Sequence, residues 1–307
     1  PVTREDLRRH EARLTRPLSV ELADATVFNT PPPTQGIASL IILALFDRLG
    51  VGRGETFAHV HGLIEAVKRA FIVRDAEVAD PDFTRDLAGF LDPVWLDAEA
   101  ERIDMKRAAP WPAVARRGDT IWAGAIDAEG RAVSFIQSLF WEFGSGVVLP
   151  RTGILWQNRG SSFSLDPAHH NRLAPGRKPF HTLNPPLARF RDGRTMVYGS
   201  MGGDGQPQFQ AQIFTRAMRF GMELGEAIAA PRWRLGRTWG SGPVGVAMES
   251  RFDPDLVAAL ERAGHTIVVV PEAYDDGMGH AGAIVRRADG RLFGASDPRS
   301  DGAAVAA

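Results

Sequence analysis

The hydrophobic pattern of the chain changes at residue 119, and this change limits the folds that the chain can adopt. Before it, apolar residues recur at helical spacing over 36–49 and 55–71, and a further helix is expected over 92–105. Gly50 is a typical stop for the first of these helices. Residues 108–118 contain prolines and are expected to form an exposed linker. The first part of the chain is therefore predicted to be mostly helical.

After residue 119 the pattern is typical of strands. Residues 120–126 and 132–139 are expected to pair as a hairpin around a turn at 127–130. Strands that meet through hairpins favour antiparallel sheets, so an α+β fold is expected. Further strands are predicted at 196–198, 266–270 and in a hairpin over 280–295, and helices at 209–228 and 254–263.

Charge and composition exclude several function classes. The chain has 36 basic and 37 acidic residues, a formal net charge of -1, which gives no electrostatic reason to expect nucleic acid or a membrane surface as a partner. The absence of cysteine excludes disulfides and thiolate metal sites. The apolar run at 38–46 is too short to span a bilayer and is expected to be a buried helix. Because the chain opens at Pro1 and reads like the middle of a protein, further residues are expected upstream, and the compartment stays open between cytoplasm and periplasm.

A series of short motifs in a fixed order resembles the gamma-glutamyltransferase family of N-terminal-nucleophile hydrolases. No HExxH, GxSxG or Walker motif is present, so the resemblance depends on this succession. The motifs are Gly118-Asp119-Thr120, Phe143-Gly144-Ser145-Gly146, Pro175-Gly176-Arg177-Lys178-Pro179, Gly199-Ser200-Met201-Gly202-Gly203, Glu249-Ser250-Arg251-Phe252, Gly279-His280-Ala281 and Gly294-Ala295-Ser296-Asp297-Pro298-Arg299. Upstream, residues 17–20 and 31–33 match the end of the family's large subunit.

The resemblance implies a four-layer αββα sandwich and a chain in two pieces. Residues 1–119 would be the C-terminal part of the large subunit, and residues 120–307 the small subunit that carries the nucleophile. Together they would form one composite domain, a heterodimer of cleavage products that could dimerise further. The reaction needs no metal and no cofactor.

The nucleophile that the resemblance implies is Thr120. A threonine hydroxyl reacts poorly unless a nearby base takes its proton. Once Thr120 is the first residue of a chain, its own α-amine, with an unperturbed pKa of about 7.7–8.0, is that base. In the family the same hydroxyl attacks the preceding carbonyl, here that of Asp119, and an N-to-O acyl shift followed by hydrolysis frees the amine.

Three further catalytic residues follow from the resemblance. Ser138 falls where the family has a hydroxyl that hydrogen-bonds the nucleophile. Gly202 and Gly203 match the backbone of the oxyanion hole, where glycines let two N–H groups approach the tetrahedral intermediate. A bulky side chain at Gly202 is expected to lower turnover while the chain still folds.

The predicted substrate-binding residues depart from the family pattern. Phe140 replaces the asparagine that helps to hold the γ-glutamyl group in the family. Arg159 and Ser162 replace the two residues that hold the substrate's α-amino group there. His181 and Thr182 replace the family's paired serines. A cation in place of an acidic anchor suits a carboxylate. The stretches at 137–142 and 156–160 resemble the oxamate-amidohydrolase-like branch, whose substrate is a small anionic amide.

Several alternatives stay open at this stage. Ordinary gamma-glutamyl transfer or hydrolysis and a cephalosporin-acylase-like reaction would use the same nucleophile. Arg159 could instead be a salt-bridged scaffold residue, and the glycines at 199–205 could hold a phosphate at a helix N-terminus. From another class, the chain could be an unprocessed relative that acts as a binding protein.

Self-cleavage separates the catalytic hypothesis from the last alternative. We expect the full-length protein, which includes the upstream residues, to run as two bands, one of which begins at Thr120 by N-terminal sequencing. Thr120→Ala should stay a single chain, because it lacks the attacking hydroxyl. A variant that still splits at this bond would mean that a separate protease makes the cut.

Overall fold

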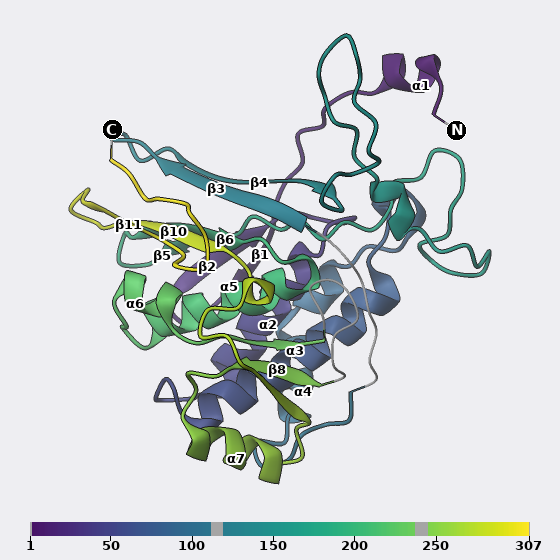
Figure 1. Ribbon diagram of the computed structural model, residues 1–307. Helices are drawn as coiled ribbons and strands as arrows, with labels where there is room; N and C mark the ends of the chain where they lie inside the picture. The colour runs from purple at the N-terminus through teal and green to yellow at the C-terminus, as the bar shows by residue number, and fades with distance from the viewer. Residues whose placement is uncertain (1, 112–118, 237–244, 307) are drawn as a thin grey trace.

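Six strands from both parts of the chain form the central sheet. The computed structural model of the protein describes residues 2–111, 119–236 and 245–306. The strand order is β1 (Leu18–Glu21), β2 (Ala25–Asn29), β5 (Leu187–Phe190), β6 (Thr195–Ser200), β10 (Ala281–Arg286) and β11 (Leu292–Ser296), with every neighbouring pair antiparallel. Because β1 and β2 precede residue 119, the pairing of β2 with β5 joins the two parts of the chain (Figure 1).

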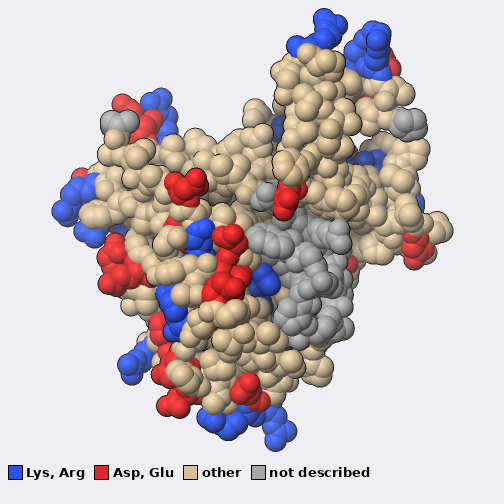
Figure 2. Space-filling model, in the orientation of Figure 1, with Lys and Arg blue, Asp and Glu red and all other residues tan. Residues whose placement is uncertain are grey.

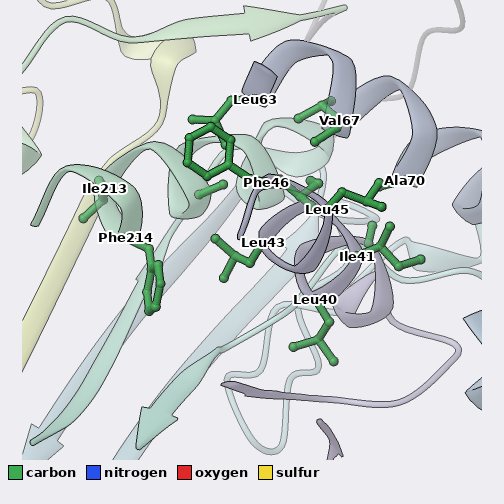
Figure 3. Packing of buried hydrophobic residues seen from close by; sticks show 14 of the residues in the cluster. Leu40, Ile41, Leu43, Leu45, Phe46, Leu63, Val67, Ala70, Ile213 and Phe214 are labelled. Carbon is green, nitrogen blue, oxygen red and sulfur yellow. The ribbon is translucent and has the colours of Figure 1, made fainter. Parts of the chain in front are cut away.

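Helices cover one face of this sheet, and α2 (Gly36–Arg48) is buried along most of its length. Its residues from Gly36 to Phe46 are all buried, which suits a helix that is apolar all round. Figure 3 shows α2 packed against α3 (Phe57–Glu77) and α5 (Gln206–Phe214). Gly50, with φ of 62°, follows α2 in the left-handed region and ends it as expected. The other helices are α1 (Arg4–Arg9), α4 (Pro93–Glu101), α6 (Leu224–Ala229) and α7 (Pro254–Arg262).

A two-stranded hairpin, β3 (Asp119–Ile126) and β4 (Ala132–Phe140), lies on the opposite face of the central sheet (Figure 1). It rests on β6 and β10 through the ring of Trp122. This ring lies on Gly199 and Gly282, which are direct cross-strand partners. A Cβ added at Gly282 would lie 2.6 Å from Trp122 Cζ3, and one at Gly199 would overlap the indole. The absence of a side chain at these two glycines therefore fixes the position of the hairpin on the sheet.

A third sheet is built around β8 on the far side of α5. It contains β7 (Trp233–Leu235), β8 (Val246–Glu249) and β9 (Ile267–Val270), and β8 pairs with β9 in parallel. Two buried glutamines of α5 bind β7: Gln208 accepts from Leu235 N at 2.7 Å and donates to Leu235 O at 3.1 Å, and Gln212 bonds Trp233 in the same way. Side-chain amides thus satisfy backbone groups of β7, as buried polar groups require.

Buried charges hold the end of β11 to the third sheet. The fully buried side chains of Glu249 and Arg299 form an ion pair, and Arg299 also pairs with Asp297 at 3.1 Å. Arg232 lies 2.6 Å from Asp297. Two of the motifs that carry the family resemblance, at 249–252 and 294–299, therefore have structural roles in this cluster.

Most elements predicted from the sequence are confirmed, with differences at their ends. The prediction of a single helix over 209–228 is wrong. The helix α5 continues into a short π-helix at Thr215–Arg219. Gly221, with φ of 71°, then separates it from α6. The predicted helix over 92–105 ends at Glu101. The sequence analysis missed β1, β2, β5, β7 and β8, all of which have three to five residues.

The α+β class is confirmed, and the described residues form three of the four layers expected. These are the hairpin, the central sheet and the helices beneath it (Figure 1). The outer face of the hairpin is exposed and apolar at Ile121, Val133 and Phe135. No helix within the described residues has the length and hydropathy needed to cross a bilayer. On the face shown in Figure 2, basic and acidic side chains are interspersed.

Replacing Gly199 by alanine should destabilise the protein, because the added Cβ overlaps the ring of Trp122. Overpacking of this kind costs about 1–3 kcal/mol, so urea unfolding should show a lower midpoint. Gly52→Ala is the matched control, since a Cβ there meets no atom within 4 Å. In a Trp122→Ala background, Gly199→Ala should cost less than in the wild type. Equal costs in the two backgrounds would show that the ring and the glycine are not coupled.

Candidate active site

Thr120 lies at an irregularity of the hairpin that carries it. Asp119 pairs with Phe140 and Ile121 pairs with Gln137, so one residue of β3, Thr120, faces two residues of β4, Ser138 and Leu139. Such a bulge bends a strand and redirects a side chain. The structure therefore brings the predicted nucleophile and the predicted hydroxyl partner to one position. The side chain of Thr120 is half-buried, and its Oγ1 accepts a hydrogen bond from Gln206 Nε2 at 3.4 Å.

The β4 side of the bulge has an unusual backbone. Phe140 has φ of 81°, a left-handed value that is rare for a bulky residue. The Ser138 hydroxyl accepts a hydrogen bond from Phe140 N at 2.8 Å and so ties this turn together. Strain of this kind occurs at functional sites that the surrounding structure holds in place.

Gly202 and Gly203 lie just before α5, four and three residues before Gln206. Their φ values of 124° and 52° are ones that side chains disfavour. Among the described residues, neither N–H donates a hydrogen bond to a backbone acceptor, and both glycines are buried. N–H groups that donate to no described backbone acceptor, just before a helix, are suited to stabilise a negative charge.

The buried side chain of Gln35 connects this glycine turn to Thr182. Gln35 Nε2 donates to Gly203 O at 2.8 Å and to Thr182 O at 2.6 Å. Arg74 Nη1 donates in turn to Gln35 Oε1 at 3.1 Å. The turn at Gly202 and Gly203 and the predicted substrate residues are thus held together by a residue that precedes position 119.

The expectation that Gly202→Val would leave folding intact is wrong. A Cβ at Gly202 would lie 2.7 Å from Phe209 Cε2, and the φ of 124° strains any side chain. A valine there would disturb the core as well as the turn at Gly202 and Gly203, so this substitution cannot report on catalysis alone.

Arg159 is buried, and no carboxylate of the described residues pairs with it. Only 4% of the residue is exposed, and no Asp or Glu among the described residues forms an ion pair with it. Its guanidinium lies 4.8 Å from the centre of the Phe140 ring, and Nη1 donates to Thr182 Oγ1 at 3.4 Å. Its Nη2 has no hydrogen-bond partner within the described part of the chain. Burial lowers the pKa of Arg159 to about 10, so the group stays charged at neutral pH. Within the described residues, the scaffold salt bridge considered as an alternative is not formed.

A cavity of about 330 Å³ adjoins this arginine. Phe140 and Thr182, which both contact Arg159, line it together with Ser162 and Phe180. The Ser162 hydroxyl lies 3.0 Å from Arg159 O and 2.8 Å from Phe180 O, so its hydrogen is used within the cavity wall. Phe140, Arg159, Ser162 and Thr182 are therefore brought together, and Phe140 connects them to the bulge at Thr120 through its pairing with Asp119.

His181 is held beside this group as a neutral ring. Its backbone N–H donates to Pro33 O at 2.8 Å, and its carbonyl accepts from Gln35 N at 2.9 Å. Burial, and secondarily the positive charge of Arg159, lower the pKa of His181 to about 3. An imidazole without charge cannot anchor an anion by itself, which leaves Arg159 as the cation of this group.

A cluster of potential metal ligands, His61, Glu65 and His265, lies apart from these residues. His61 Nδ1 and His265 Nε2 are 2.8 Å apart, as in a hydrogen bond, and Lys68 Nζ lies 2.7 Å from Glu65 Oε1. The lysine already balances the carboxylate, so the cluster has the chemistry of a structural hydrogen-bonded group. It holds residues 104–109 through Asp104 O and Ala109.

Gln206 was missed by the sequence analysis. Residues 206, 208, 210 and 212 are all glutamines and all buried in α5. Long polar side chains inside a buried helix must find partners, which is a signal that the sequence does contain. Asn184, which donates to Gln206 Oε1 at 3.2 Å, has no comparable signal.

Comparison with known proteins relates this arrangement to a single family. The family profile described as Gamma-glutamyltranspeptidase matches residues 1–307. The oxamate amidohydrolase proenzyme of Klebsiella pneumoniae is 52% identical over 306 residues, which cover 99% of this chain and 58% of that protein. The glutathione hydrolase-like YwrD proenzyme of Bacillus subtilis is 41% identical over 307 residues, again 99% of this chain and 58% of that protein.

A solved structure gives the same relation. The cephalosporin acylase from Bacillus halodurans superposes with a TM-score of 0.86 at 33% identity, over 98% of this chain and 54% of that chain. The chain therefore spans a little more than half the length of the relatives that it matches.

The low pKa of His181 predicts an effect of pH on stability. The unfolded chain binds a proton at this histidine below about pH 6.5, whereas the folded chain does not until about pH 3. The free energy of unfolding should therefore fall as the pH is lowered below 6.5, by at most about 1.4 kcal/mol per pH unit from this group. His181→Gln should show a shallower fall in urea unfolding between pH 7.5 and pH 5. Parallel curves for wild type and variant would contradict a buried neutral His181.

Proposed function

Since the chain belongs to the gamma-glutamyltranspeptidase family, we propose that it acts as a self-cleaving amidohydrolase with Thr120 as nucleophile and a small anionic amide as substrate. The observation that carries the proposal is Arg159, a buried guanidinium with one unpaired nitrogen among the described residues. A buried cation without a carboxylate is costly unless an anion completes it. A substrate carboxylate is the partner that the chemistry favours.

Self-cleavage would begin with attack of Thr120 Oγ1 on the carbonyl carbon of Asp119. The C–N bond then breaks, the amine takes up a proton, and the chain is joined through an ester. Water hydrolyses this ester, which releases a carboxylate at Asp119 and frees both the hydroxyl and the α-amine of Thr120. The bulge supports this proposal, because it isolates Thr120 from the regular ladder at the bond to be broken. The products, 1–119 and 120–307, would stay together as a heterodimer through β2 and β5.

Turnover would use the same hydroxyl. The free α-amine of Thr120 takes the proton from Oγ1, which attacks the amide carbonyl of the substrate. The N–H groups of Gly202 and Gly203 are the proposed donors to the resulting oxyanion, and one such donor typically stabilises a transition state by about 2.7–4 kcal/mol. Ammonia leaves with the proton, and water then hydrolyses the acyl-Thr120 ester. For oxamate the products would be oxalate and ammonia.

The second candidate is hydrolysis of a γ-glutamyl amide, the reaction suggested by the name of the Bacillus subtilis relative. Such a substrate carries an α-ammonium, which needs acceptors. Arg159 repels an ammonium, and the Ser162 hydroxyl is bonded to two backbone carbonyls. These contacts favour an acyl group without an amine. A bulkier acyl group, as in a cephalosporin acylase, would need the cavity beside Phe140.

The decisive assay compares oxamate, its neutral analogue oxamide and a γ-glutamyl anilide on the processed protein. We expect oxamate to be hydrolysed with the highest kcat/KM. Faster turnover of the γ-glutamyl compound would return the protein to the second candidate. Hydrolysis of no amide by a cleaved protein would contradict both.

Arg159→Gln should raise KM for oxamate by roughly 10- to 100-fold, the equivalent of one charge-assisted hydrogen bond of about 1.5–3 kcal/mol. Its kcat/KM for oxamide should change little, because the neutral analogue has no carboxylate for the guanidinium. The KM of Arg159→Lys for oxamate should lie between those of the wild type and Arg159→Gln, since lysine keeps the charge but loses the bidentate fork. Arg151→Gln removes an exposed arginine eight positions earlier in the chain and is the control. An equal loss on oxamate and oxamide would assign Arg159 a structural role.

A further inference from the structure

We propose that Gln206 is a positioning residue that holds the Thr120 hydroxyl in one orientation through a buried chain of side-chain amides. The proposal rests on the proposed function only in taking Thr120 as the nucleophile. It assigns a role to a residue 86 positions away in the sequence that is itself expected to touch no substrate.

The chain of contacts runs from the bulge into the core. Gln206 Nε2 donates to Thr120 Oγ1 at 3.4 Å, and Asn184 Nδ2 donates to Gln206 Oε1 at 3.2 Å. Ser39 Oγ lies 2.8 Å from Asn184 Oδ1 and 3.0 Å from Gln210 Oε1. Ser39, Asn184, Gln206 and Gln210 are at most 3% exposed. Water therefore does not compete for the bonds among these four residues, and each amide keeps its partner.

Backbone carbonyls set the direction of the whole chain. Asn184 Nδ2 lies 3.2 Å from Thr182 O, which can only accept, so this side of the Asn184 amide must be the nitrogen. The same nitrogen faces Gln206, whose oxygen must then point toward Asn184. The Nε2 of Gln206 is left to face Thr120. The donor at the nucleophile is thus fixed by the backbone at Thr182, which also accepts from Arg159 through its side chain.

A fixed donor at Thr120 Oγ1 has two chemical consequences. It occupies one lone pair of the oxygen, so the hydroxyl hydrogen must point elsewhere, as transfer to a base requires. It also stabilises the oxygen when the acyl ester breaks and negative charge develops on Oγ1. Both effects apply to self-cleavage and to turnover, because the two reactions share this atom.

The neighbouring Gln208 provides a matched comparison. It is buried in the same helix and also donates and accepts, but its partners are backbone groups of Leu235 and Asp204. Methionine has nearly the length and volume of glutamine and lacks both amide groups. Gln206→Met and Gln208→Met therefore remove similar bonds from similar places, and only the first removes a contact to Thr120.

Two rates should respond to Gln206→Met. A net hydrogen bond corresponds to roughly a tenfold change, so self-cleavage should slow by about tenfold in a time course of the uncleaved chain. In cleaved protein, kcat should fall by about tenfold for any amide that is hydrolysed, while KM stays within about twofold. Gln208→Met should lower the thermal midpoint by a similar amount but leave the rate of cleavage and kcat close to wild type.

The outcomes separate this inference from the proposed function. If Thr120→Ala abolishes cleavage while Gln206→Met cleaves and turns over normally, Gln206 does not position the nucleophile and the proposed function stands. If the wild type neither cleaves nor hydrolyses an amide, the proposed function fails, and the crystal structure of Gln206→Met decides the inference. The Thr120 side chain should then occupy more than one rotamer, and a single unchanged rotamer would overturn the proposal.

Discussion

The packing of the Trp122 indole ring on two glycines of the central sheet decides where the rest of the site can be. Trp122 is two residues after Thr120 on β3, and its ring needs Gly199 on β6 and Gly282 on β10 to lie flat against the sheet. Gly199 begins the stretch that continues into Gly202 and Gly203 at the start of α5. The same contact that docks the hairpin therefore sets the nucleophile against the turn that is proposed to stabilise the oxyanion.

The relative positions of the site residues are maintained by polar groups as much as by apolar packing. Gln35 joins Thr182 to Gly203, and the glutamines of α5 bind β7 on one side and Asn184 on the other. A buried amide that is fully bonded fixes both distance and direction, whereas an apolar contact fixes only distance. The arrangement explains why a helix at the centre of the core contains four glutamines.

Periodicity in the sequence was sufficient to predict the long elements, because α2, α3 and the β3–β4 hairpin each contain several repeats of their pattern. It missed β1 and β2, whose four and five residues are too few for a pattern and which form only because β5 offers a neighbouring edge. It also joined α5 to α6, since a single Gly221 did not outweigh the apolar spacing.

The site residues also divide into those that the sequence could predict and those that it could not. Thr120 could be predicted only through the order of the family motifs, as a lone threonine in a strand has no distinguishing pattern. Whether a described carboxylate pairs with Arg159 depends on which residues the fold brings near it, and the contact of Gln206 with Thr120 spans 86 positions. Tertiary contacts of this kind leave no trace in local spacing.

The pairing of β2 with β5 would change the physical nature of the molecule if the chain is cut after residue 119, as proposed. Val27 lies opposite Ala188 in a ladder whose two strands would then belong to separate polypeptides. Before the cut, folding is a unimolecular process in which a covalent tether supplies the second strand. After it, recovery from full denaturation becomes a bimolecular encounter that slows on dilution. The peptide bond is thus needed to assemble the sheet but not to keep it, and the cut protein would be stable for as long as it is never completely unfolded.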